Sequence, residues 1–504
     1  MSQLKKGALL NYTTIILTNV VGLAITPFII SQLGKAEYGV YTAIGALVGS
    51  ISVLDFGLNN TIVRFVAKYQ AEKDLKGEQN FLSTVMLIYL FISALIVIVG
   101  FIFYPNIDSY FSKMSLEEIE IAKTMFIILI FNLAIRLPGG AFTGICSGYE
   151  QFVFPKVLNI IRYIVRSIMV VAILLWGGRA ISIVILDTIM NVSIVLVTAY
   201  FVLRKLKVRF KLYSFNKSFI KEILGYSVWV FVFSLVGMFQ WKAGHVVLGR
   251  VVVSEVLAVY GVGIMLGTYY GAFSTAISSV FLPRATKMTV GNSSNEELTD
   301  MMIRVGRMSS IVLFYILGAF ILFGKQFVFL WVGSSFYDSW VIAVMIMAAY
   351  TIPLVQGFGN SILEAKNKLS FKAILYLIFM FVGVGIGALL ARYYGAIGMI
   401  SGSVIGWLIV QNVMNFYYYK VIKLNILRFF KELLNRTFLI VLITIGIGIV
   451  INLIPGEGWI NFIIKAFCYS VVYAVLMYSF GMIAYEKKIF KDGFDLVFKK
   501  IKRA

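Results

Sequence analysis

Long apolar runs recur along the whole chain, and they decide what it can fold into. Stretches of roughly 18 to 25 apolar residues follow one another from Leu9 to Tyr485, each long enough to cross a hydrocarbon core of about 30 Å as a helix. The 504 residues are 60% hydrophobic and only 13% charged, well below the charged share of an ordinary globular domain. The sequence therefore predicts an all-α polytopic membrane protein without a separate soluble catalytic domain.

The positions of these runs predict about fourteen transmembrane helices. The first run follows Lys5 and Lys6 but is too long for a signal-peptide core and lacks a small-residue cleavage site, so we expect it to remain as the first helix. The expected helices cover 9–32, 38–67, 81–104, 118–146, 156–176, 180–203, 223–249, 255–283, 303–323, 338–363, 372–391, 397–419, 437–454 and 462–485.

The basic residues follow this predicted topology. The formal net charge is +22, and most of the 45 lysines and arginines fall in the two termini and the even-numbered connections. The predicted external loops hold only six of them: Lys35, Lys113, Arg179, Arg250, Lys325 and Arg392. This bias is the positive-inside pattern and predicts cytoplasmic N- and C-termini. Because the charge follows the membrane surface, it indicates contact with phospholipid and argues against nucleic acid as a partner.

Few residues are available for metal, redox or cofactor chemistry. The chain has one histidine, His245, and two cysteines, Cys146 and Cys468, which lie in or next to apolar runs. No CxxC, HExxH or Walker-type signature is present. We therefore expect no enzyme activity, no metal site and no cofactor.

A weak internal repeat suggests the domain organisation. At an offset of 222 residues, "AEYGV" (36–40) aligns with "AVYGV" (258–262), and the expected helices keep the same spacing. A repeat of six helices preserves orientation, and parallel repeats of this kind typically enclose a central transport site. The predicted parts are a six-helix lobe over 1–205, a basic cytoplasmic linker over 206–222, a second six-helix lobe over 223–425, and two further helices with a basic cytoplasmic tail over 426–504.

Charged side chains inside the predicted helices are the most informative residues of the chain. An ionisable group at this depth is costly and normally faces a bundle interior or a water-filled cavity. Four cations, two acids and the histidine meet this description: Arg136, Arg162, Arg166, Lys242, Asp55, Asp187 and His245. With the histidine neutral, two positive charges remain in excess. We therefore expect a cationic lumen that binds an anionic substrate.

The same charges allow a structural interpretation. Arg162 and Arg166 are four residues apart and share a helix face, so Asp187 of the next helix could pair with them. Asp55 and Asp187 could thus hold the first lobe together as buried ion pairs, or bind a coupling ion. Lys242 has no acidic neighbour in its own helix, which favours a lumen role for it.

Uncharged polar residues accompany these charges in the first two helices. Within the expected helix 38–67, Asp55 and Asn59 share one face, and Asn60 and Arg64 share another. Arg64 is near the cytoplasmic interface, where it either lines the lumen or extends to the headgroups. The first helix has a polar stripe that suits close packing or ligand contact. The lumen candidates without charge are Asn59, Asn60, Asn11 and Thr18.

Two segments carry a family resemblance. "LGKAEYGVY" (33–41) followed by "DFGLNNTIVRFVAKY" (55–69) resembles the polysaccharide transporter branch of the multidrug/oligosaccharidyl-lipid/polysaccharide (MOP) flippase superfamily, which includes the O-antigen flippases. The positions that fit the family pattern are Gly34, Tyr38, Gly39, Gly57, Leu58 and Arg64. The predicted helix layout extends this resemblance over essentially the full chain.

The resemblance implies both a fold and an activity. It implies two six-helix lobes in a V around a central cavity, with two extra C-terminal helices. It also implies alternating-access transport of an oligosaccharide repeat unit, linked to a polyprenyl phosphate or undecaprenyl pyrophosphate, from the cytoplasmic to the outer leaflet. By position, Asp55, Arg64, Lys242 and His245 would line the lumen, while Arg136, Arg162 and Arg166 carry over less directly.

The family resemblance further implies a bacterial or archaeal cell membrane and a place in cell-surface polysaccharide biosynthesis, beside polysaccharide polymerase and ligase machinery. Na⁺, H⁺ or the membrane potential could drive transport. Two alternatives remain open. One is a Na⁺- or H⁺-coupled exporter of drugs or metabolites, which would need acidic and aromatic lumen groups, and the other is a lipid II flippase.

Overall fold

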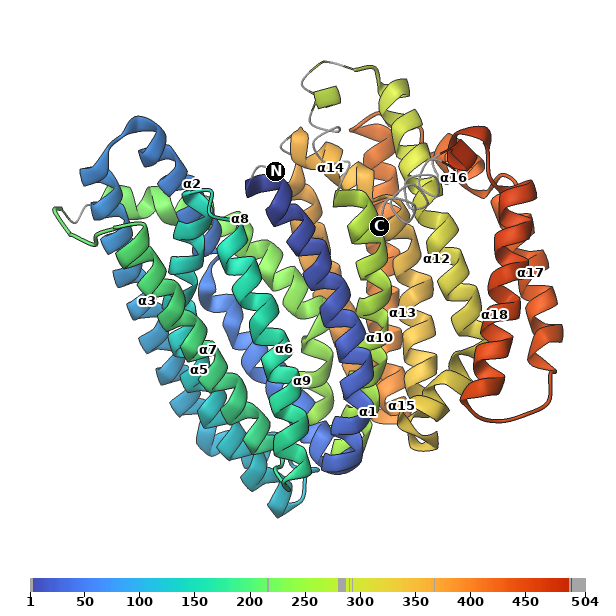
Figure 1. The fold of residues 1–504 in the computed structure, drawn as a ribbon, viewed down its shortest axis with the longest axis horizontal. Coiled ribbons are helices and arrows are strands. Elements are labelled where there is room, and N and C mark those ends of the chain that lie inside the picture. Colours follow the sequence, from blue (N-terminus) through green and yellow to red (C-terminus); the bar gives the residue numbers. More distant parts are fainter. Residues whose placement is uncertain are drawn as a thin grey trace, which may run out of the picture. The chain divides into compact units, whose positions relative to one another are not determined.

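The structure is a computed structural model and describes residues 3–214, 217–279, 287–289, 291, 293–366, 368–488 and 491. All regular elements in these ranges are helices (Figure 1). Eleven stretches are long and apolar enough to cross a membrane, or twelve if one bent helix pair counts as a single span. The prediction of an all-α polytopic membrane protein is confirmed.

The predicted count of fourteen crossings stays a prediction. Two of the eleven stretches contain a residue with non-helical backbone: Gly34 (φ 76°) in the first and Gly395 (φ 53°) in the ninth. Both fall where the sequence predicts a loop between two helices. A left-handed φ of this kind is readily adopted by glycine because it has no Cβ.

Packing divides the chain into two compact units. The first unit comprises Met1–Gly261 and Ala373–Gly406, and the second comprises Val262–Lys372 and Trp407–Ala504. Two long helices, α10 (Ser254–Ser279) and α15 (Leu369–Lys420), contribute residues to both units. The predicted lobes, 1–205 and 223–425, stay a prediction.

Helices α5, α6 and α7 form the framework of the first unit together with α1. Helix α5 packs against α1, α2, α3 and α7, and α6 lies between α1 and α7 (Figure 1). The elements of this unit before α10 are α1 (Gln3–Ile51), η1 (Ser52–Asp55), α2 (Leu58–Glu72), α3 (Leu75–Phe103), η2 (Tyr104–Asn106), α4 (Ile107–Tyr110), α5 (Leu116–Gly148), α6 (Val153–Leu175), α7 (Ala180–Tyr200), η3 (Phe201–Lys205), α8 (Lys217–Trp241) and α9 (Ala243–Gly249).

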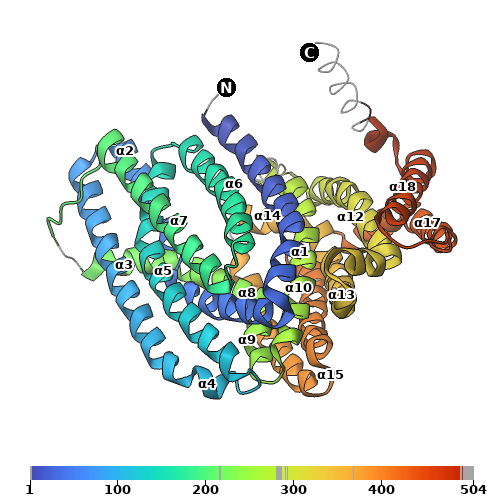
Figure 2. The same cartoon turned by 60° about the horizontal axis from the view of Figure 1, so that its bottom comes forward.

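Helix α12 is the centre of the second unit. It packs against α13, α16, α17 and α18, and α17 and α18 run side by side (Figure 2). The elements of this unit after α10 are α12 (Asn295–Val332), η4 (Ser334–Phe336), α13 (Tyr337–Val355), α14 (Gly357–Ala365), α16 (Ile426–Leu434), α17 (Thr437–Asn452), α18 (Trp459–Leu476) and η5 (Met477–Gly481).

Two long helices begin at the same local signal. Ser115 caps α5 and Ser294 caps α12, in each case by accepting from the backbone N–H three residues on. Glu118 and Glu297 return the bond to the backbone N–H of the capping serine, at 2.7 and 2.9 Å. These reciprocal bonds satisfy N–H groups that a helix start leaves without a partner.

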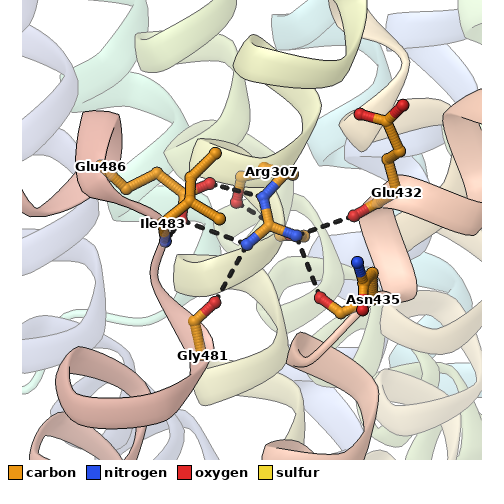
Figure 3. A network of polar contacts seen from close by, with 7 residues as sticks. Arg307, Glu432, Asn435, Gly481, Ile483 and Glu486 are labelled. Carbon is orange, nitrogen blue, oxygen red and sulfur yellow. Dashed lines mark hydrogen bonds and ion pairs between the residues drawn. The ribbon is translucent and has the colours of Figure 1, made fainter.

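A buried ion pair fastens the C-terminal segment of the second unit. The Arg307 guanidinium of α12 is 3% exposed and donates to both carboxylate oxygens of Glu486, at 2.6 and 3.2 Å. It also donates to three backbone carbonyls, those of Glu432, Asn435 and Gly481 (Figure 3). Because every nitrogen of the fork is used, the charge is compensated despite its burial.

Candidate functional site

The chain is broken where the sequence predicts one continuous helix over 38–67. Helix α1 ends at Ile51, the 3₁₀ turn η1 follows, and Phe56 (φ 51°) and Gly57 (φ 66°) are both left-handed before α2 begins. The prediction of an unbroken helix is wrong here. Asp55 therefore ends one element and Asn59 belongs to the next, so they do not share the face of a single helix.

A second break lies at Lys242, inside the predicted helix 223–249. Helices α8 and α9 meet at this residue, and Phe231–Trp241 and Ala243–Gly249 are bent by 49° relative to one another. Non-helical backbone at membrane depth is tolerated only where protein or a water-filled cavity satisfies its polar groups. Both breaks in the first unit therefore mark positions where polar groups accumulate.

The two breaks pack against each other. The half-buried Lys242 donates through Nζ to the carbonyl oxygen of Gly49 at 2.8 Å, and the Ser52 hydroxyl donates to the same oxygen at 2.6 Å. The rings of Phe56 and Phe231 stack with centroids 4.6 Å apart. Lys242 is thereby held beside the end of α1 and the η1 turn.

Arg136 of α5 connects the charges of three other elements. Its exposed guanidinium interacts electrostatically with Asp55, Arg162 and Lys242. Arg136 and Arg162 make neither a hydrogen bond nor an ion pair with any residue that the structure describes. We call Arg136, Arg162 and Lys242 the cationic cluster. Its acidic neighbours are Asp55, which interacts with Arg136, and Asp187, which interacts with Arg162 but is paired with Arg166. Because Arg166 neutralises Asp187, the group keeps an excess of positive charge.

Arg166 differs from the cationic cluster because it has an ion-pair partner, although both charges of this pair act on Arg162. Its Nε contacts Oδ1 of Asp187, and its Nη2 donates to Oδ2 at 2.9 Å, so the pair is bidentate. Tyr41 lies close to both charges. Since the pair is only about one fifth exposed on each side, it is a largely buried, compensated pair. Of the two arginines on α6, Arg166 is neutralised and Arg162 is not.

The His245 ring takes no part in the cationic cluster, although its backbone N–H donates to the Lys242 carbonyl at 3.1 Å. It is buried on α9, where its ring meets that of Tyr260 edge-on at 4.7 Å between centroids. A Cβ added to Gly261 would lie 3.3 Å from its Nε2 and 3.2 Å from the Thr42 methyl, which shows how tightly these helices enclose the ring. Its Nδ1 has no hydrogen-bond partner among the described residues. This environment is apolar and holds none of the cations.

The uncharged lumen candidates are scattered. The Oδ1 of Asn59 is buried against Gly144 of α5, and Asn60 and Arg64 are exposed on α2. The Thr18 hydroxyl donates within α1 to the Ile15 carbonyl at 3.1 Å. The side chain of Asn11 lies outside the described residues. The structure therefore brings together Arg136, Arg162, Lys242 and Asp55, but not these candidates.

Glu37 has a positional role that the sequence did not reveal. Its carboxylate is 5% exposed, pairs with Arg179 at 2.5 Å and accepts from the backbone N–H of Ala180 at 2.7 Å. It thus caps the start of α7 from the turn at Gly34. In the second copy of the repeat Val259 stands at this position, so the acidic residue of "AEYGV" was the available signal.

Several solved structures share this fold. One is lipid II flippase MurJ in an inward closed conformation, with a TM-score of 0.71 at 16% identity, covering 92% of this chain and 97% of that chain. Another is an inward-facing multidrug resistance MATE family transporter of the MOP superfamily, with a TM-score of 0.58 at 17% identity and coverage of 78% and 96%. A third is a MOP superfamily transporter from Pyrococcus furiosus, with a TM-score of 0.52 at 15% identity and coverage of 85% and 95%.

The sequence itself matches a family model. A search of curated proteins gave no significant match. The model of the polysaccharide biosynthesis protein family matches residues 4–289, more than half of the chain. The family model agrees with the predicted family, and the three neighbours in fold are a flippase and transporters rather than enzymes, as the sequence predicts. The chain belongs to the polysaccharide biosynthesis protein family and has the fold of the MOP superfamily of flippases and transporters.

Proposed function

We propose that this multi-pass membrane protein is a flippase that moves a polyprenyl-phosphate- or polyprenyl-pyrophosphate-linked oligosaccharide from the cytoplasmic to the outer leaflet. The head group of such a lipid carries sugars and one or two phosphates. It would have to cross about 30 Å of hydrocarbon, where an unpaired charge is very costly. A polar, cation-lined path through the protein removes much of this cost.

The cationic cluster is the observation that carries this proposal. Arg136 and Arg162 have no ion-pair partner among the described residues, and Lys242 bonds only a backbone carbonyl. Arginine presents a planar fork of donors that matches phosphate oxygens in pairs, and lysine adds a compact positive charge. Arg166, in contrast, is occupied by Asp187 and is proposed as a structural residue rather than a ligand of phosphate.

Transport in liposomes tests the function. The substrate is a fluorescent undecaprenyl-diphosphate oligosaccharide, and flipping is followed by the loss of fluorescence to a membrane-impermeant quencher. We expect wild type to flip this lipid, and Arg136→Ala and Lys242→Ala to lose about tenfold or more in rate, which corresponds to about 1.4 kcal/mol. Lys123→Ala is the matched control, because Lys123 lies on the same helix as Arg136 but pairs with exposed Asp108.

The same preparation tests the two alternatives. A Na⁺- or H⁺-coupled exporter would take up a cationic dye under an ion gradient and would leave the lipid in place. A lipid II flippase would move lipid II faster than a lipid-linked oligosaccharide. The fold is shared with proteins of both kinds, but the excess of cations over free carboxylates in the cationic cluster suits an anionic substrate better than a cationic dye.

Orientation, location and coupling complete the proposal. The positive-inside bias supports cytoplasmic termini. The family supports a bacterial or archaeal cell membrane and a place beside polysaccharide polymerase and ligase machinery. Asp55 is the candidate for Na⁺ or H⁺ coupling, because it interacts with the cationic cluster and makes no ion pair with a described residue, whereas Asp187 is paired with Arg166. The arrangement of two lobes that alternate in access remains part of the proposal.

A further inference from the structure

A polar cavity lies in the second unit, at the end of α12 that leads into α13. Its volume is about 480 Å³, within the range of small-molecule sites. The lining residues come from the ends of α12, α13 and α17 and from the turn before α18. Its polar and aromatic members are Lys325, Gln326, Phe329, Tyr337, Trp340, Asn452 and Glu457. We call it the Trp340 pocket.

Aromatic rings make one wall of the Trp340 pocket. The indole N–H of Trp340 donates to the Phe320 carbonyl at 2.9 Å, which fixes the ring. The rings of Phe329 and Tyr337 are 6.0 Å apart between centroids, and the Lys325 ammonium lies 5.0 Å from the centre of the Tyr337 ring. Flat apolar faces with polar edges are therefore available at fixed positions.

The Trp340 pocket is also lined by polar groups that have no partner among the described residues. Asn452 and Glu457 are exposed, and neither makes a hydrogen bond or ion pair with a residue that the structure describes. Glu457 stands between Gly456 (φ 125°) and Gly458 (φ 104°), a backbone that only glycine adopts readily. The turn thus holds a carboxylate and an amide at the rim, free to bind a ligand.

A hydrogen-bonded chain fixes the floor below this rim. Gln326 donates to Asn461 at 3.0 Å, and Asn461 donates to the Pro455 carbonyl at 3.1 Å. Lys465, which is 6% exposed, lies with its Nζ 3.5 Å from the Gln326 oxygen. These bonds connect α12 to the turn that presents Glu457. The cavity is therefore preformed, which lowers the entropic cost of binding.

We propose that the Trp340 pocket binds a sugar residue of the oligosaccharide, which makes it a second, glycan-specific subsite. This inference rests on the proposed function, and the predicted topology places 324–337 and 455–461 on the outer side. A sugar ring has an apolar face that can lie on an aromatic ring and hydroxyls that both donate and accept. Asn452 supplies both donor and acceptor, Glu457 supplies acceptors, and Lys325 supplies donors.

Saturation-transfer NMR on full-length protein in nanodiscs tests this subsite. The probes are free mono- and disaccharides of three classes: neutral hexoses, N-acetylhexosamines and hexuronic acids. We expect transfer to the ring protons of at least one class, and about a tenfold weaker affinity when Asn452→Ala and Glu457→Gln are combined. Both side chains are exposed, so the variant should fold. Asp338→Asn is the control, because it removes an exposed carboxylate next to Tyr337 that does not line the pocket.

Three results would overturn the inference. They are no transfer to any saccharide class, equal transfer in wild type and the combined variant, or transfer only to phospholipid head groups. Binding of sugar-free undecaprenyl pyrophosphate is measured in parallel. If the combined variant keeps this binding, a failure of the glycan subsite is distinguished from a failure of the proposed flippase function, which depends on the cationic cluster in the other unit.

Discussion

Lys242 donates a 2.8 Å hydrogen bond to the carbonyl oxygen of Gly49, and this contact joins the bend between α8 and α9 to the last turn of α1. The same oxygen also accepts from Ser52. The ammonium group is therefore placed precisely but is not neutralised by a carboxylate. Lys242 can therefore exchange the neutral Gly49 carbonyl for an anionic ligand, and such an exchange is what a transport site requires.

Replacement of Lys242 should separate its structural role, the hydrogen bond to Gly49, from the role of its charge in transport. In Lys242→Met the Gly49 carbonyl keeps its bond to Ser52, so we expect stability to fall by only about 1 kcal/mol, the net value of one hydrogen bond. Flipping should fall about tenfold or more, because the charge is lost. Thermal unfolding in detergent and the liposome assay measure the two effects. Lys242→Arg should keep most of the activity, and equal loss in both variants would argue against a charge-based role.

The class of fold was predictable from the sequence, because the length of each apolar run can be read directly along the chain. Apolar length alone marks a spanning helix, and the glycines at 34 and 395 fall where loops were expected. The helix breaks at Phe56 and Lys242 were missed, since neither an apolar run nor its periodicity shows them. Gly57 was the local signal for the first break. Phe56 and Gly57 both have a left-handed φ, and glycine adopts such a φ more readily than other residues.

The candidate site was predicted only as a set of residues. The sequence places Arg162, Arg166 and Asp187 in neighbouring helices, but it does not show which arginine pairs with the carboxylate. Which arginine pairs with Asp187 depends on the rotation of α6 relative to α7, and in the structure the partner is Arg166. The pair of Arg307 and Glu486 was not predicted at all, since partners 179 residues apart leave no local pattern.

The ion pair of Arg166 and Asp187 should be structural. In Arg166→Ala or Asp187→Asn a largely buried charge or its donor loses its partner, and we expect each change to destabilise by about 3 kcal/mol. The double variant should lose clearly less than the sum, because no charge remains unpaired. A double-mutant cycle of unfolding measures this coupling. Strictly additive losses would show that the two side chains act independently.

Arg307→Ala should destabilise the second unit strongly. The change leaves the 1% exposed Glu486 carboxylate without its ion-pair partner and removes the donor to three carbonyls. We therefore expect the free energy of unfolding to fall by about 3–5 kcal/mol. Arg428→Ala is the matched control in the same unit, since Arg428 pairs with Asp300 and Glu432 on the surface and should contribute at most about 1 kcal/mol. Comparable losses in both variants would contradict the anchoring role of Arg307.

Gly39 should not accept a side chain. A Cβ added there would overlap the Ser254 carbonyl, whereas one added to Gly45 on the same helix meets nothing within 4 Å. We expect Gly39→Ala to lower the unfolding temperature measurably, because the backbone of α1 must move away from α10, while Gly45→Ala should raise it slightly, since alanine is the better helix former. Differential scanning fluorimetry of both variants gives the comparison. Identical unfolding temperatures for Gly39→Ala and Gly45→Ala would show that Gly39 does not pack tightly against Ser254.

The affinity for sugar-free undecaprenyl pyrophosphate is the most direct test of the central claim, that unpaired cations of the first unit bind a lipid-linked anion. It should be measured in nanodiscs for wild type and for Arg136→Gln combined with Arg162→Gln, with undecaprenol as the uncharged comparison. We predict tight binding of the pyrophosphate by wild type, a loss of about a hundredfold in the variant at about 1.4 kcal/mol per cation, and weak binding of undecaprenol by both. Equal affinity for the charged and uncharged lipids, unchanged in the variant, would contradict the account.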